Sequence, residues 1–225
     1  MGVCNSTAAA APVRESVAAK RFDAKLSKVV VDYAKSKPGK PQTFMSLLLK
    51  FPKLQNGFDQ CREIFAECDR DKDDHITMEE MKEGLYKVGF SPGDDALIAD
   101  CFDSSDLDQN QSIEFKEFVV LLAVLFVLKK GQANGLDGVK PEITDTFKTI
   151  LDCFVFFDAN CDGILKKHEV LAGMKDPGEQ GNKAADKSLN MSVMKRFEEM
   201  DWNHNNSIAF KEFMFALEGW VLDDA

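Results

Sequence analysis

The sequence predicts an all-α fold of two lobes, each made of two helix–loop–helix units, preceded by a helical N-terminal extension. Three observations support this prediction. A twelve-residue pattern of acidic and polar residues occurs four times, apolar residues at helical spacing flank the copies, and the copies are unevenly spaced. They begin 37 residues apart in the first pair, 43 apart in the second, and 52 apart between the pairs. The wider gap divides the four units into two lobes.

The third copy, residues 158–169, sets the register of the pattern. Its oxygen donors are Asp158, Asn160, Asp162, the backbone carbonyl of Ile164, and Glu169 at position 12. Calcium takes six to eight oxygen ligands at about 2.3–2.6 Å, and a loop with this spacing supplies them. Gly163 at position 6 permits the sharp turn at positive φ, and Lys166 at position 9 stands where coordination often runs through water. We therefore expect a calcium-binding EF-hand loop.

The other three copies supply oxygen donors in the same register. The first, residues 69–80, offers Asp69, Asp71, Asp73, the carbonyl of His75, Thr77 and Glu80. The second, residues 106–117, offers Asp106, Asp108, Asn110, the carbonyl of Ser112, Glu114 and Glu117. The fourth, residues 201–212, offers Asp201, Asn203, Asn205, the carbonyl of Ser207, and Glu212. The sequence thus predicts up to four bound calcium ions.

An aliphatic residue stands at position 8 of every loop, where the two loops of a lobe are expected to touch through a short strand. These residues are Ile76, Ile113, Leu165 and Ile208. Position 6 varies more: Gly163 suits the left-handed turn best, Asp74 and Asn206 tolerate it, and Gln111 suits it least. Our hypothesis is that the first and third loops bind calcium best and the fourth binds weakest or only through its pair.

Composition suggests where the lobes begin and end. We place the first lobe at residues 54–130 and the second at residues 141–225, after an extension over residues 1–53. Between them, residues 131–140 contain three glycines, which disfavour a continuous interlobe helix and predict a bent or flexible hinge.

Within the extension, apolar residues recur at helical spacing between residues 22 and 33, which predicts an amphipathic helix. They are Phe22, Leu26, Val29, Val30 and Tyr33. Prolines and a glycine at 38–41 end this helix, and a second apolar stretch follows over residues 44–51. Two alternatives remain open. Both segments pack on the first lobe, or they lie on a membrane or occupy the lobe's groove until calcium releases them.

The first six residues match the M-G-x-x-x-[ST] signal for myristoylation of Gly2 after removal of Met1. One myristoyl chain anchors a protein only marginally, so stable anchoring needs a second signal. Cys4 is a candidate palmitoylation site, and residues 14–53 carry ten Lys and Arg against three acidic residues. We expect association with an anionic membrane on its cytoplasmic face, or a partly cytosolic protein.

The remaining composition excludes several classes of function. The net charge is −10 although the extension is basic, so the rest of the chain is strongly acidic, which argues against nucleic acid as a main partner. Six cysteines without a CxxC pair, and no secretory leader, predict a reducing compartment. The longest apolar run, residues 118–128, is too short to cross a bilayer and predicts a buried or groove-lining helix. The three histidines lie inside the loops at positions that do not ligate through their side chains, so no catalytic constellation is visible.

These loops, together with the segments Phe51–Leu54, Lys116–Leu122 and Arg196–Trp202 and the acylation signal, resemble the calmodulin superfamily over about residues 54–220. The resemblance is closest to the larger calmodulin-like proteins of plants. It implies a calcium sensor that regulates other proteins and has no catalytic activity of its own. Calcineurin-B-like and neuronal sensor proteins share the myristoylated four-EF-hand plan, which makes membrane recruitment of a kinase, phosphatase or channel an analogy to test.

The leading functional hypothesis is a sensor that exposes an apolar groove to an amphipathic helix of an unidentified target protein when calcium binds. Candidate groove residues are Met78, Met81, Leu85, Phe115, Phe118, Leu122 and Phe126 in the first lobe and Phe147, Phe154, Met194, Phe213, Met214 and Trp220 in the second. The alternative is a calcium buffer with little conformational change. A calcium-triggered photoprotein fits poorly, because the chain has two Trp, two Tyr and no histidine outside the loops.

Overall fold

The computed structural model describes residues 17–36, 49, 51–87, 90–106, 108–129, 140–174, 191 and 194–222. These ranges are helical apart from turns, loops and two isolated β-bridges, which confirms the all-α prediction. The elements are α1 (Val17–Ser36), α3 (Phe51–Cys68), α4 (Met78–Lys87), the 3₁₀ helix η1 (Pro92–Asp94), α5 (Asp95–Ser105), α6 (Phe115–Lys129), α7 (Pro141–Phe157), α8 (Lys167–Gly173) and α10 (Phe210–Leu222). Residues 194–200 are also helical.

Helices flank each of the four loops, and the loops associate in pairs. Ile76 and Ile113 exchange two backbone hydrogen bonds of 3.0 and 2.9 Å, and Leu165 and Ile208 exchange two of 2.8 Å. Each bridge joins the position-8 residues of neighbouring loops, so the predicted short strand contact is confirmed in both pairs. We call α3 to α6 the first EF-hand pair and α7 to α10 the second EF-hand pair.

Helix starts follow the positions of proline. Pro141 is the first residue of α7, where its missing N–H has no intrahelical partner to lose. In the same way α3 accepts Pro52 in its first turn. This helix begins at Phe51, three residues before the predicted start of the first lobe. Most of the predicted hinge, and most of the apolar stretch 44–51, lie outside the described residues.

Helix α6 is the centre of the fold. Every residue from Glu117 to Lys129 is buried, which decides between the two predictions for the apolar run in favour of a buried helix. Within the first EF-hand pair α6 packs on α5, and on other sides it packs on α10, α1 and α7. A helix that is apolar all round has no face to turn to water, so it needs neighbours on every side. Among the described residues, no helix is long and apolar enough to cross a membrane.

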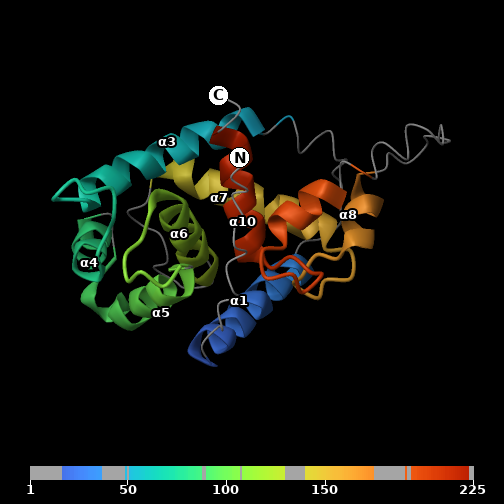
Figure 1. Cartoon of the computed structure of the whole chain (residues 1–225), viewed down its shortest axis with the longest axis horizontal. Helices are drawn as coiled ribbons and strands as arrows, with labels where there is room; N and C mark the ends of the chain where they lie inside the picture. Colours follow the sequence, from blue (N-terminus) through green and yellow to red (C-terminus); the bar gives the residue numbers. More distant parts are fainter. Residues whose placement is uncertain are drawn as a thin grey trace, which may run out of the picture.

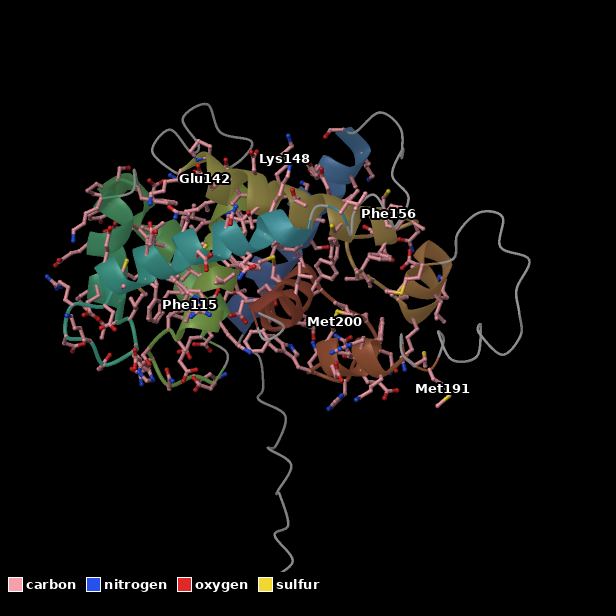
Figure 2. The ribbon with its side chains drawn as sticks, turned by 90° about the horizontal axis from the view of Figure 1, so that it is seen from above. Phe115, Glu142, Lys148, Phe156, Met191 and Met200 are labelled. Carbon is pink, nitrogen blue, oxygen red and sulfur yellow. The ribbon has the colours of Figure 1, made fainter. Side chains whose placement is uncertain are left out.

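The two EF-hand pairs share one core. Helix α3 packs along α7, α6 packs along α10, and the buried residues of both pairs form a continuous cluster. In Figure 1, α10 stands between the first pair, at left, and α8, at right. Figure 2 shows α3 passing across α7, with Glu142 and Lys148 of α7 on the outer side. We call the boundary between the two pairs the seam.

The predicted amphipathic helix of the extension is confirmed as α1. Its packing differs from the alternative in which it packs on the first lobe. Beyond α5 and α6 of the first pair, α1 also packs on α7 of the second. The hydroxyl of Tyr33 donates to Asp152 of α7 at 2.6 Å. Because the seam is closed, its two sides form one surface, and α1 lies across both rather than on the first lobe alone.

Gly57 sits where α3 crosses α7, and it allows the two helices to approach closely. A Cβ at this position would lie 2.0 Å from Oγ1 of Thr146, which is buried. We expect Gly57→Ala to lower the free energy of unfolding by about 1–2 kcal/mol, because overpacking outweighs the gain in helix propensity. Urea unfolding at a fixed calcium concentration measures this change.

The matched control for this substitution is Gly93→Ala. There a new Cβ would have as its near neighbour the Ser91 hydroxyl at 3.6 Å, so stability should change little. If Gly57→Ala instead raised stability, as an ordinary glycine replacement in a helix does, the tight crossing of α3 and α7 would be wrong.

Candidate metal centres

The described residues of all four loops share one backbone pattern. Positions 4 and 6 have positive φ in every loop, at 55–60° and 63–81°. The position-6 residues are Asp74, Gln111, Gly163 and Asn206. Gln111, which the sequence ranked as least suited, therefore takes the same left-handed turn as Gly163, at some cost in strain.

The aspartate at position 1 fixes this turn. In each loop its two carboxylate oxygens accept hydrogen bonds from the backbone N–H groups of positions 5 and 6, at 2.9–3.3 Å. The four aspartates are Asp69, Asp106, Asp158 and Asp201. Because the amide hydrogens point at the carboxylate, the loop closes around it and directs its other donors inward.

The glutamate at position 12 is buried in each loop and bound to the loop's own backbone. Glu80, Glu117, Glu169 and Glu212 each accept the N–H of position 9 at 2.8–3.1 Å. Glu80 also accepts the backbone N–H of Arg70 and the Thr77 hydroxyl. Thr77, predicted as a ligand, thus holds Glu80 in this structure. Hydrogen bonds from Thr77, in particular from its backbone, lower the pKa of Glu80 and favour the ionised form that binds cations.

In the first EF-hand pair the carboxylates converge closely. Oxygens of Asp69, Asp71 and Asp73 lie within 4.8 Å of one another in the first loop. In the second loop the same holds for Asp106, Asp108 and Glu117. Desolvation, followed by repulsion from neighbouring carboxylates, raises the pKa of Asp71. A divalent cation would relieve this repulsion, and hard oxygen donors in a closed loop fit calcium.

The second EF-hand pair keeps this scaffold with less charge. In the third loop Asn160 donates to Asp162 at 2.9 Å. The Lys166 ammonium lies 3.4 Å from Oδ2 of the same Asp162. The sequence excluded Lys166 as a ligand but missed this competing contact, because both residues lie in a loop, where no helical spacing brings them together. The fourth loop has amides at positions 3 and 5, Asn203 and Asn205.

The structure places every predicted ligand in one of these four loops, and their coordination of calcium stays a prediction. Within the first EF-hand pair, the His75 ring lies 3.7 Å from the Glu114 carboxylate. This contact joins predicted ligand positions of the two paired loops. The predicted acylation sites, Gly2 and Cys4, lie outside the described residues.

Comparison with known proteins agrees with this geometry. Residues 58–122 match the family described as EF-hand domain pair. The Arabidopsis thaliana protein named "Probable calcium-binding protein CML21" is 36% identical over 212 residues, which cover 92% of this chain and 87% of the relative. The corresponding protein CML22 is 31% identical over 211 residues, covering 91% and 90%. Calcium-dependent protein kinase 22 of the same plant is 26% identical over 71% of this chain and 27% of the kinase.

Lys166 should weaken calcium binding at the third loop. We expect Lys166→Thr, which copies Thr77 of the first loop, to tighten binding there about two- to fivefold, the range for losing an exposed ion pair that competes for a ligand. Calcium titration calorimetry of the intact protein measures the change.

The control is Lys167→Thr, which removes the same charge one residue away. Lys167 pairs with Glu198 at 3.6 Å and lies 5.5 Å from the centre of the Phe197 ring, and neither residue is a predicted ligand. Equal effects of the two substitutions would show that net charge alone matters and that the Lys166–Asp162 contact does not.

Proposed function

This chain belongs to the calmodulin-like calcium-binding proteins of the EF-hand family, and we propose that it is a calcium sensor that regulates a partner protein at a membrane. Calcium is its ligand. In this proposal the ion binds in all four loops and changes the packing at the seam, which lies within the shared apolar core.

The observation that carries the proposal is the position of α6. Calcium buffering needs only loops, whereas the first EF-hand pair of this chain packs a helix that is apolar on every side against the second pair and α1. The groove residues predicted from the sequence lie around it and are covered. Met81, Leu85, Phe118, Leu122, Phe126, Phe147, Phe154, Phe213 and Met214 are buried, and Met78, Phe115 and Met194 are partly buried. The Trp220 side chain is not among the side chains that the structure describes.

The loops are connected to the seam through their position-12 glutamates. Glu117 lies in the first turn of α6, and Glu212 lies in the first turn of α10. These two helices pack on each other across the seam. A cation that draws either glutamate toward its loop turns the helix that carries it, and this motion changes the packing between the pairs. Apolar surface then becomes available to a partner.

Regulation rather than catalysis is the role that the comparisons support. The two relatives that match along most of their length are named as calcium-binding proteins, and the kinase shares about a quarter of its length with this chain. The catalytic activity of the kinase would have to lie in the part outside that match. We therefore propose no catalytic activity for this chain.

Membrane association is proposed from the N-terminus. Gly2 and Cys4 supply the acylation signals, and α1 presents Lys25, Lys28 and Lys35 at its exposed face. Acyl chains combined with basic side chains are the two-signal arrangement that holds a protein on an anionic leaflet.

Calcium should expose apolar surface. We expect the fluorescence of an environment-sensitive apolar dye to rise severalfold when calcium is added to the purified protein, because the seam opens. The control carries Glu80→Gln, Glu117→Gln, Glu169→Gln and Glu212→Gln, which keep the side-chain shape and remove the bidentate carboxylates. Calcium binding measured by calorimetry without any dye response would identify a buffer instead.

Acylation should determine membrane binding. We expect protein made with an N-myristoyltransferase to float with vesicles that contain phosphatidylserine, and Gly2→Ala to remain in the soluble fraction. Cys4→Ser tests the second acyl chain separately in cells. Equal flotation of wild type and Gly2→Ala would contradict the anchoring proposal.

A further inference from the structure

Helix α1 covers the seam with a regular apolar stripe. Phe22, Leu26, Val30 and Ala34 recur every four residues, and each is at most 9% exposed. Residues four apart lie on the same face of a helix, so the stripe runs along one side of α1 for more than three turns. It packs on α5 and α6 of the first EF-hand pair and on α7 of the second. In Figure 1, α1 lies below α10, at the bottom of the view.

Polar contacts fix α1 near both ends of this stripe. At one end, Asp23 forms an ion pair of 2.7 Å with the buried Lys211 of α10. The same ammonium donates to the backbone carbonyl and the hydroxyl of Ser104 of α5, at 3.1 and 2.9 Å. At the other end, the Tyr33 hydroxyl donates to Asp152. The surface therefore recognises a helix by charge and hydrogen bonding as well as by apolar area.

Helix α1 also lies directly on a predicted calcium loop. A Cβ on Gly163 would lie 2.4 Å from the Ser27 hydroxyl and 3.1 Å from the Ser27 carbonyl oxygen. The backbone alone does not require glycine here, because Asp74, Gln111 and Asn206 take the same turn with side chains. The additional reason for glycine in the third loop is the space that α1 occupies.

We propose that the surface beneath α1 is a binding site for an amphipathic helix, that α1 is its internal occupant, and that a partner helix of the same pattern replaces it. The partner helix has apolar residues four apart over three turns, with a carboxylate beside the first to meet Lys211. This proposal rests on the proposed sensor function and adds to it the surface that is used and the kind of partner that fits.

The position of α1 connects this exchange to calcium. Since α1 contacts both EF-hand pairs and the third loop, the seam cannot open while all of these contacts remain. Opening therefore weakens the binding of α1, and by reciprocity the loss of α1 tightens calcium binding by the same factor. The partner helix meets less competition once calcium is bound.

A labelled peptide of residues 17–36 is the probe for this site. We expect it to bind full-length protein that carries Leu26→Asp and Val30→Asp at least tenfold more tightly than wild type without calcium, because the internal competitor is removed. The same peptide carrying both Asp substitutions should not bind, and a peptide with Asp23→Ala should bind more than fivefold weaker.

A second variant disturbs α1 without placing a charge in the core. Gly163→Asn keeps the left-handed turn, as Asn206 does in the fourth loop, but its side chain fills the space of Ser27. We expect backbone amides of α1 to exchange hydrogen faster in this variant. The peptide meets the same clash, so a peptide that carries Ser27→Gly should bind this variant more tightly than the unmodified peptide does. Asn206→Gly, the reverse exchange at position 6 of the fourth loop, should leave the exchange of α1 amides unchanged.

Hydrogen exchange of wild-type protein decides where the peptide binds. Saturating peptide should speed the exchange of α1 amides, because peptide and α1 compete for one surface. Saturation without any change in α1 would overturn the proposal, as would absence of peptide binding to the variant that carries Leu26→Asp and Val30→Asp. A calcium-dependent dye response with either of these outcomes would leave the sensor function standing. Peptide binding to that variant without a dye response would support the docking site and contradict the sensor function.

Discussion

The burial of α6 between the other helices of its own EF-hand pair, the second pair and α1 is the constraint on which the rest of the structure depends. A helix that is apolar on every side loses stability wherever it meets water, at roughly 25 cal/mol for each Å² of apolar surface. Its own pair covers one side through α5, and α10 and α1 cover others. The two pairs are therefore parts of one core.

Polar groups at the seam follow from that arrangement. Lys211 is buried because α10 lies against α1 and α5, and a buried ammonium needs a carboxylate and further acceptors, which Asp23 and Ser104 supply. Lys116 of α6 lies 3.7 Å from the buried Glu218 of α10, a charge pair that joins the two EF-hand pairs. Such pairs add little net stability but permit few alternative arrangements, so they favour one packing of the pairs over others.

In the four loops, the backbone conformation and the charge of the predicted ligands depend on different residues. Their conformation depends on the aspartate at position 1, the glutamate at position 12 and backbone N–H groups, which all four loops share. Positions 3, 5 and 9 vary among aspartate, asparagine, threonine, glutamate, lysine and alanine without changing that conformation. Calcium affinity can thus differ between loops of one shape. In the third loop, Lys166 lies beside the carboxylate of Asp162, a predicted ligand.

The sequence by itself determined the features whose causes lie within a few residues: the four loops and their register, the pairing at position 8, the amphipathic helix α1 and calcium as the ligand. Each follows from chemistry inside twelve residues or from helical periodicity. Only the tertiary structure decided that α1 packs on both pairs and that Lys211 is buried. It also decided that Gly57 lies against Thr146 of α7 and that Gly163 lies against Ser27 of α1. These features depend on contacts between residues about 90 to 190 positions apart, and no local pattern records which distant surface an apolar stripe will cover.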